Sequence, residues 1–335
     1  MNFRRILLLS LLGLVASPLA IAQQPIVIKF SHVVARDTPK GKAADQFAKL
    51  VNERAGGKLK VEVYPSSQLY KDGEEMNAIQ LGAVQMLAPS LAKFGPLGVR
   101  EFELFDLPFI FDDYNALHRI TNGPIGANLL KKLEPKGITG LAYWDNGFKD
   151  FSANKLTKTP ADFKGLKMRI QSSKVLEAQM RALGVIPQVM AFSEVYQALQ
   201  TGVVDGTENP PSNFYTQKMH EVQKYMVQSQ HGYLGYAVIV NKKFWDGLPD
   251  DLKKIVSAAM VESTRYANAI AQKENADATD AVKASGKTQV VALSPAERSA
   301  LKKALVKVHK DVESRIGADL IKAVYKETGF DPAKP

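Results

Sequence analysis

Arg169 has the clearest capacity for binding chemistry in this sequence. It stands near the end of a predicted strand, just before a helix that begins at Ser172 and Ser173. Strand ends at helix N-termini are where α/β proteins bind anions, because free backbone N–H groups and the helix dipole converge there. A guanidinium adds a planar fork that donates two parallel hydrogen bonds to one carboxylate. The pattern therefore indicates an anion-binding arginine, with an ordinary surface arginine as the alternative.

A proline-rich loop and a lysine supply further polar candidates. The loop over residues 208–211 contains two consecutive prolines, so it is rigid enough to aim the Asn209 amide at a carboxylate. We interpret Glu208, in the same loop, as the structural partner of a nearby cation. Lys149 follows residues 144–148, where the chain is expected to cross between two domains.

Candidates in the first part of the chain lie on the corresponding loops and at a helix start. They are Ser31, His32, Lys42 and Ser90. Ordinary turn chemistry and solvation are the alternative for all four. Phe192 and Tyr236 are candidates for the walls of a cleft, although aromatic side chains more often pack in a core.

No catalytic motif is present in the sequence. It lacks a nucleophile elbow, a phosphate-binding loop, a dinucleotide fingerprint and a zinc-protease helix motif. Its five histidines are far apart, and there is no cysteine, so neither thiol chemistry nor cysteine metal sites are available. We predict no catalytic residue, no metal site and no cofactor. An enzyme whose site is assembled from distant residues remains the alternative.

Composition and charge narrow the class of partner. The 335 residues carry 44 Lys+Arg and 34 Asp+Glu, a net charge of +10, with an ordinary globular content of apolar residues. No three basic residues are consecutive, so the charge favours the steering of small anions over binding to nucleic acid. The length predicts about two domains.

The N-terminus has the pattern of a cleaved signal peptide. Arg4 and Arg5 precede an apolar run over residues 6–16, and residues 20–22 form an A-x-A cleavage site. We therefore predict a signal peptide over residues 1–22 and export of the mature chain. The alternative is an uncleaved membrane anchor, but the apolar run is too short to span about 30 Å of hydrocarbon.

Alternating strands and helices predict an α/β fold with largely parallel strands. In the first part of the chain we expect strands at 26–30, 59–63 and 83–88, and helices beginning at Pro39 and near Glu74. In the second part we expect strands at 166–170 and 203–205, and helices beginning at Ser172/Ser173 and Phe192.

Two segments resemble each other 120 residues apart. Residues 78–84 (AIQLGAV) and 198–204 (ALQTGVV) both read as a helix, a glycine and a strand, and each leads into a loop that contains proline. The pattern predicts two similar lobes that present matching loops across a cleft. Chance is the alternative, because helix–glycine–strand junctions are common.

A long helix is predicted over residues 250–285, which contain neither glycine nor proline. It would be about 54 Å long, whereas a domain of ~150 residues is roughly 35–40 Å across. The helix should therefore span both lobes. Residues 294–297 (SPAE) then form a capping box for a further helix.

Several blocks resemble the solute receptors of tripartite ATP-independent periplasmic (TRAP) transporters, the DctP family. The blocks are residues 30–34 (FSHVV), 63–69 (VYPSSQL), 106–109 (DLPF), 144–149 (WDNGFK), 165–170 (GLKMRI), 190–200 (MAFSEVYQALQ) and 203–210 (VVDGTENP). The similarity covers essentially the whole mature chain. It is closest to the C4-dicarboxylate receptors of the family, which bind succinate, fumarate or malate.

The resemblance implies a two-lobed periplasmic binding protein, a Venus-flytrap fold, with the long helix spanning both lobes. Lobe I would comprise 23–146 plus 235–274, and lobe II 147–234 plus 275–330. The hinge would lie near 145–148 and 233–237.

The resemblance also implies roles for individual residues. Arg169 would form the salt bridge to a carboxylate, and Asn209 would contact the same ligand. Lys149 stands where many sialic-acid receptors of the family carry a second arginine. We expect Lys149 to bind the second carboxylate of a dicarboxylate, with Lys42 as the weaker candidate. The alternative is that Lys149 only pairs with a neighbouring acid such as Asp150.

The sequence thus predicts a periplasmic receptor without a catalytic step or cofactor. It would bind a C4-dicarboxylate and deliver it to the small and large integral membrane subunits of a TRAP permease. It would act as a monomer and bind no nucleic acid. The alternatives are a receptor for a sugar acid or a 2-oxo acid, and a periplasmic enzyme acting on a carboxylated metabolite.

We predict that the exported protein begins at Gln23, because cleavage follows the A-x-A pattern of residues 20–22. N-terminal sequencing of periplasmic material measures this directly. Material that retains Arg4 and Arg5 would contradict the prediction.

Overall fold

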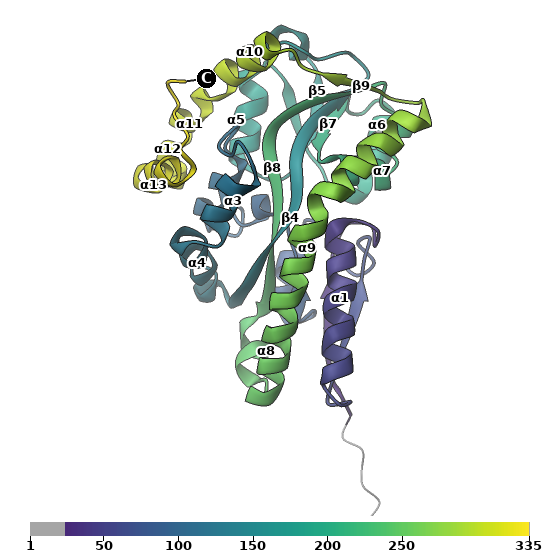
Figure 1. Ribbon diagram of the computed structural model, residues 1–335, viewed down its shortest axis with the longest axis vertical. Coiled ribbons are helices and arrows are strands. Elements are labelled where there is room, and N and C mark those ends of the chain that lie inside the picture. Colours follow the sequence, from purple (N-terminus) through teal and green to yellow (C-terminus); the bar gives the residue numbers. More distant parts are fainter. Residues whose placement is uncertain (1–23, 335) are drawn as a thin grey trace, which may run out of the picture.

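The computed structural model describes residues 24–334 and has mixed α/β architecture (Figure 1). The signal peptide and cleavage site expected over residues 1–22, and Gln23, lie outside the described residues. Among the described helices, none is long and apolar enough to cross a membrane.

The strands are β1 (Ile26–Ser31), β2 (Leu59–Tyr64), β3 (Met86–Leu87), β4 (Ile138–Ala153), β5 (Lys167–Ile170), β6 (Ile186–Val189), β7 (Gly206–Asn209), β8 (Tyr225–Asn241) and β9 (Gln289–Ala292). The α-helices are α1 (Pro39–Arg54), α2 (Glu75–Gln80), α3 (Tyr114–Thr121), α4 (Pro124–Lys131), α5 (Lys174–Ala182), α6 (Val195–Gln200), α7 (Pro211–Thr216), α8 (Lys242–Gly247), α9 (Asp250–Ser285), α10 (Pro295–Leu305), α11 (Lys307–Asp311), α12 (Glu313–Ile316) and α13 (Ala318–Thr328).

The strands of residues 24–334 form one sheet with a mirrored order. The order is β2-β1-β3-β8-β4-β7-β5-β6, with β9 beside β8. β1 pairs in parallel with β2 and β3, and β5 pairs in parallel with β6 and β7. The long strands β4 and β8 run antiparallel between these two sets. The sheet therefore has two halves of the same design, β2-β1-β3-β8 and β6-β5-β7-β4.

The two segments that resemble each other occupy equivalent places in these halves. α2 is followed by Gly82 and β3, and α6 is followed by Gly202 and β7. Both glycines adopt positive φ, +77° and +73°, a conformation that ends a helix and that other residues rarely adopt. The loops after β3 and β7 thus leave equivalent strands of the two halves.

Most predicted elements are confirmed to within about one residue, and three differ further. α9 covers residues 250–285 as expected, and Ser294 and Glu297 form the predicted capping box. β3 is shorter than expected, and the helix expected from Phe192 begins with a 3-10 turn, Phe192–Glu194. The strand expected at 203–205 is wrong, because β7 covers Gly206–Asn209; Glu208 and Asn209 therefore lie in this strand and not in the loop expected over 208–211. Just before β7, the Asp205 carboxylate accepts a hydrogen bond from the Lys167 N–H at 2.7 Å. A side chain thus takes the place that a backbone carbonyl would have in the strand pairing.

α9 packs along both halves of the molecule and completes the hydrogen bonding of the strand crossing (Figure 1). It contacts α1 in the first half and α7 and β9 in the second. The β4–β8 register shifts between Asp145 and Gly147. At this bulge Asn268 Oδ1 accepts from the Asp145 N–H at 2.9 Å, and Asn275 Nδ2 donates to the Asn146 carbonyl at 2.7 Å. The bulge falls within the segment where the hinge is expected, while the lobe boundaries stay a prediction.

The two halves touch on the side where the loops after β3 and β7 meet. Val33 and Val34, which follow β1, pack in one buried cluster with Phe192 and Val195 of the second half. Val33, Val34 and Phe192 also line the space between the halves in which the candidate site lies.

Candidate functional site

A narrow, partly open cavity lies between the two halves, and we call it the inner cavity. Five of the residues predicted from the sequence line it, namely Ser90, Arg169, Phe192, Asn209 and Tyr236. Five polar residues that the sequence analysis did not single out also line it, namely Lys40, Asp72, Lys93, Gln171 and Asn213.

Arg169 is almost fully buried in the wall of the inner cavity. Its Nε and Nη2 donate to the Met190 carbonyl at 3.1 and 2.9 Å, which fixes one edge of the guanidinium. The guanidinium carbon lies 5.7 Å from the centroid of the Phe192 ring. Burial lowers the pKa of Arg169, but the group stays a cation at any physiological pH. No carboxylate of residues 24–334 forms an ion pair with it, so part of its fork is available to an anion.

Lys40 places a second buried cation in the same cavity, from the opposite half. It lies in the first turn of α1, its Nζ donates to the Ala88 carbonyl at 2.9 Å, and it sits 3.7 Å above the centroid of the Tyr236 ring. Burial, together with the Lys93 charge, lowers the pKa of Lys40 to about 7. Within the described chain no carboxylate forms an ion pair with Lys40. A negatively charged ligand would restore the charged form of the lysine.

A third cation in the cavity, Lys93, is already neutralised. It forms ion pairs with Asp72 and Glu75, all three side chains being largely buried. Asp72 Oδ2 also accepts from the Phe192 N–H at 2.5 Å, a contact between the two halves. Burial opposes ionisation of Asp72, but the Lys93 and Arg169 charges outweigh it and hold its pKa at about 2.

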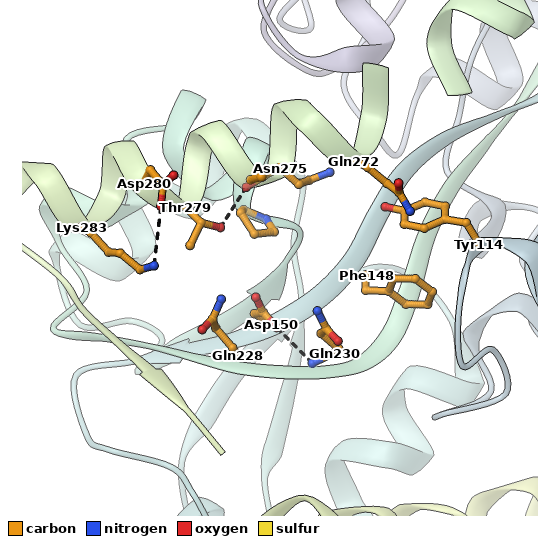
Figure 2. A pocket seen from close by; sticks show the side chains of 12 residues that line it. Tyr114, Phe148, Asp150, Gln228, Gln230, Gln272, Asn275, Thr279, Asp280 and Lys283 are labelled. Carbon is orange, nitrogen blue, oxygen red and sulfur yellow. Dashed lines mark hydrogen bonds and ion pairs between the residues drawn. The ribbon is translucent and has the colours of Figure 1, made fainter. Parts of the chain in front are cut away.

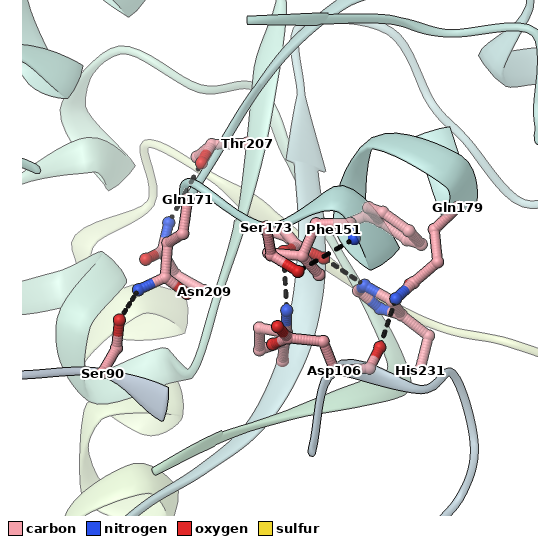
Figure 3. Close-up of polar contacts among 12 residues, drawn as sticks. Ser90, Asp106, Phe151, Gln171, Ser173, Gln179, Thr207, Asn209 and His231 are labelled. Carbon is pink, nitrogen blue, oxygen red and sulfur yellow. Dashed lines mark hydrogen bonds and ion pairs between the residues drawn. The ribbon is translucent and has the colours of Figure 1, made fainter. Parts of the chain in front are cut away.

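Amide side chains bridge the remaining walls. Gln171, one residue beyond β5, donates from Nε2 to Ser90 Oγ at 2.7 Å and so joins the two halves (Figure 3). The Asn209 amide lies nearby and donates to Thr207 Oγ1 at 3.2 Å (Figure 3). Ser90, in the loop after β3, and Asn209, the last residue of β7, therefore line one cavity from equivalent strands of the two halves.

Lys149 does not line the inner cavity. Its Nζ lies 2.6 Å from Glu208 Oε1 in a fully buried ion pair, and Glu208 Oε2 lies 2.7 Å from His231 Nε2. Burial opposes ionisation of Glu208, but Lys149 and His231 outweigh it and hold its pKa at about 2. The interpretation of Glu208 as the partner of a nearby cation is confirmed. The suggestion that Lys149 pairs with Asp150 is corrected, because its partner is Glu208.

Three further predicted residues also lie away from the lining. Lys42 forms an ion pair with Glu274 of α9 at 2.6 Å, on the outside of α1. Ser31 and His32 are fully buried beside the inner cavity without lining it. Burial and the Lys40 charge lower the pKa of His32 to about 3, so this imidazole is neutral.

The sequence did contain a pattern that could have identified Lys40 as a candidate site residue. A lysine in the first turn of a helix opposes the helix dipole, and the first turn of α1 carries no acidic residue to balance it. Such an unfavourable placement is a reason to expect an anion nearby. Lys93, Asp72 and Gln171 carried no comparable signal.

A second, more open groove lies between α9 and the strands β4 and β8 (Figure 2). Asp150, Gln228 and Gln230 line its floor, and Asp280 and Lys283 lie on α9 above them. Lys283 is 3.6 Å from Asp280, and none of the predicted site residues lies here. The groove is therefore poorly suited to an organic anion. Within residues 24–334 no group of three metal-ligating side chains was found either.

Comparisons with known proteins agree on one family. Residues 30–315 match the family described as bacterial extracellular solute-binding protein, family 7 (DctP). The chain is 64% identical over 323 residues to a Rhodobacter capsulatus protein named C4-dicarboxylate-binding periplasmic protein DctP, covering 95% of this chain and 97% of the relative.

Two solved structures extend the similarity to three dimensions. A TRAP periplasmic solute-binding protein from Shewanella oneidensis with bound succinate has a TM-score of 0.89 and 43% identity, covering 91% of this chain and 99% of that one. A TRAP periplasmic solute-binding protein from Pseudomonas aeruginosa PAO1 with bound L-malate has a TM-score of 0.84 and 44% identity, covering 86% and 100%.

We predict that Lys149→Met lowers the free energy of unfolding by about 3–5 kcal/mol, because it leaves the buried Glu208 carboxylate without its lysine. Urea denaturation measures this. The matched control is Lys273→Met, which removes an exposed ion pair with Asp277 and should cost less than about 1 kcal/mol. Adding Glu208→Gln to Lys149→Met should recover much of the loss. Equal stabilities of the two single variants would contradict the structural role of Lys149.

Proposed function

The chain belongs to the DctP family of bacterial extracellular solute-binding proteins, family 7, and from that premise we propose that it is a two-lobed receptor for a C4-dicarboxylate such as succinate, fumarate or malate. It binds its ligand without chemical change and needs no cofactor. Relatives of high identity that are named for C4-dicarboxylates, and similar structures holding succinate or malate, support this ligand class.

One observation in this chain carries the assignment. Arg169, from β5 of the second half, and Lys40, from α1 of the first half, line the same inner cavity, and neither forms an ion pair within the described chain. Burying a cation is unfavourable unless it is matched by an opposite charge. A ligand with two carboxylates can match both, which supports a dicarboxylate over a monocarboxylate.

The arrangement suits a trap that closes on its ligand. A ligand held by Arg169 and Lys40 together favours the closed state, because the open state cannot offer both contacts at once. The guanidinium would donate two hydrogen bonds to one carboxylate, and the Asn209 amide, which lines the same cavity, would donate to the same group. The ammonium of Lys40 would hold the other carboxylate, in place of the role expected for Lys149 or Lys42.

We further propose that the mature protein acts in the periplasm as a monomer and delivers its ligand to the small and large membrane subunits of a TRAP permease. The signal-peptide pattern of residues 1–22 and the periplasmic names of the relatives support this location. Growth on succinate of a strain that carries the permease but lacks this gene tests the delivery step. Unimpaired growth would contradict it.

We predict that Arg169→Ala weakens succinate binding by roughly 30- to several thousand-fold, since losing one partner of a buried charge pair costs about 2–5 kcal/mol. Arg169→Lys should also bind poorly, because an ammonium cannot reproduce the planar fork. Isothermal titration calorimetry measures both dissociation constants. Either variant within a few-fold of the unmodified protein would remove Arg169 as the anchor.

We predict that Lys40→Met weakens succinate far more than butyrate, because only succinate has a second carboxylate for the lysine to hold. The quantity to compare is the ratio of the two dissociation constants in each variant. The matched control is Lys42→Met, which lies in the same helix but pairs with Glu274 outside the cavity. If Lys40→Met weakens both ligands equally, Lys40 supports the cavity without binding the second carboxylate.

The pH dependence of binding gives this prediction a second readout. The pKa of Lys40 in the ligand-free protein is about 7, so the charged lysine becomes scarcer as the pH rises above 7. Affinity for succinate should therefore fall between pH 7 and pH 9, and binding in this range should take up a proton. Lys40→Met should lose both effects. A pH-independent affinity of the unmodified protein would contradict the role of Lys40.

A further inference from the structure

A second compartment lies directly outside the inner cavity. It is open to solvent, and we call it the outer compartment. The two spaces share four lining residues, namely Asp72, Lys93, Arg169 and Gln171. These four side chains therefore form a wall with the inner cavity on one side and the outer compartment on the other.

Three members of the wall are charged and held by several contacts each. Lys93 forms ion pairs with Asp72 and Glu75. Asp72 also accepts a hydrogen bond from the Phe192 N–H. Arg169 donates two hydrogen bonds to the Met190 carbonyl. Removing any of them would leave a buried charge unmatched or would remove the anchor for the ligand.

Gln171 differs from the other three. It is uncharged and only partly buried, and the single hydrogen bond recorded for its side chain is the one to Ser90 across the cavity, at 2.7 Å (Figure 3). It is therefore the part of the wall that can be shortened without disturbing a charge. Its bond to Ser90 also exists only while the two halves are together.

We propose that Gln171, held by Ser90, sets the length limit of the ligand by closing the inner cavity towards the outer compartment. The inference rests on the proposed function. A dicarboxylate whose carboxylates are held at Lys40 and Arg169 has to fit on the inner side of the wall. A longer chain meets the Gln171 amide, which cannot yield without losing its hydrogen bond.

The outer compartment has the properties needed to receive the excess length. Val189, Met190 and Ala191 supply apolar surface for additional methylene groups. Arg169 lines both spaces, so its guanidinium can meet a carboxylate from the outer side as well as from the inner one. In a variant with a shorter side chain at position 171, a six-carbon dicarboxylate can extend from the inner cavity into the outer compartment. It can then keep its contacts with both Lys40 and Arg169.

The test compares the binding of succinate, glutarate and adipate, with four, five and six carbons, to the unmodified protein and to Gln171→Ala by calorimetry. One surplus methylene in a fitted site costs roughly tenfold or more in affinity, so the unmodified protein should prefer succinate over adipate strongly. In Gln171→Ala the ratio of the adipate to the succinate dissociation constant should fall at least ~tenfold. Gln171→Asn should lie between the two.

Two control variants separate the possible results. Gln200→Ala, at the exposed end of α6 and outside both spaces, should leave the ratio unchanged. Ser90→Ala removes the acceptor of the Gln171 amide and should lower the ratio by a smaller factor than Gln171→Ala.

A Gln171→Ala variant that binds succinate with an unchanged ratio would overturn the length limit while the proposed function stands. Equal weakening of all three ligands would likewise overturn it, since Gln171 would then act only in closure. If the unmodified protein binds none of the three, the proposed function itself fails.

Discussion

Burial of positive charge between the two halves of the molecule is the constraint on which the site depends. Lys93 is matched by Asp72 and Glu75, and Lys149 is matched by Glu208. Arg169 and Lys40 lack such a match within the described chain, and both line the inner cavity. A buried cation without a partner costs free energy, so an anion that supplies the partner gains much of its affinity by relieving that cost. The positive charge of Arg169 and Lys40, together with the shape of the cavity, therefore favours an anionic ligand.

The mirrored sheet explains how the unmatched cations come to face each other. Each half supplies a parallel set of strands, and β4 and β8 join the halves. Because equivalent strands end at the same place in each half, Ser90 after β3 and Asn209 at the end of β7 line one cavity. α9 lies across both halves and bonds the backbone at the bulge between Asp145 and Gly147. A break in the strand ladder is thereby kept hydrogen-bonded at the expected hinge segment.

Much of the fold could be predicted from the sequence because its signals are local. The hydroxyl of Thr38 and the capping box of Ser294 mark helix starts within a few residues, and Gly82 and Gly202 end helices by their positive φ. The absence of glycine and proline over 36 residues was sufficient to predict α9. The strand expected at 203–205 was misplaced, because the Asp205 side chain bonds the Lys167 N–H of β5 and β7 begins only at Gly206.

The sequence by itself was sufficient to predict the family, most of the elements and Arg169 as an anion-binding arginine, because these predictions depend on residue type and short spacing. Which lysine lines the inner cavity was decided only by the tertiary structure. Lys40 and Lys42 are two residues apart on α1, which turns them about 200° from each other, so one enters the cavity and the other meets Glu274. Lys149 is turned to Glu208, a partner 59 residues away in the chain. Charge pairing over such separations depends on which strands become neighbours, and no local pattern in the sequence encodes it.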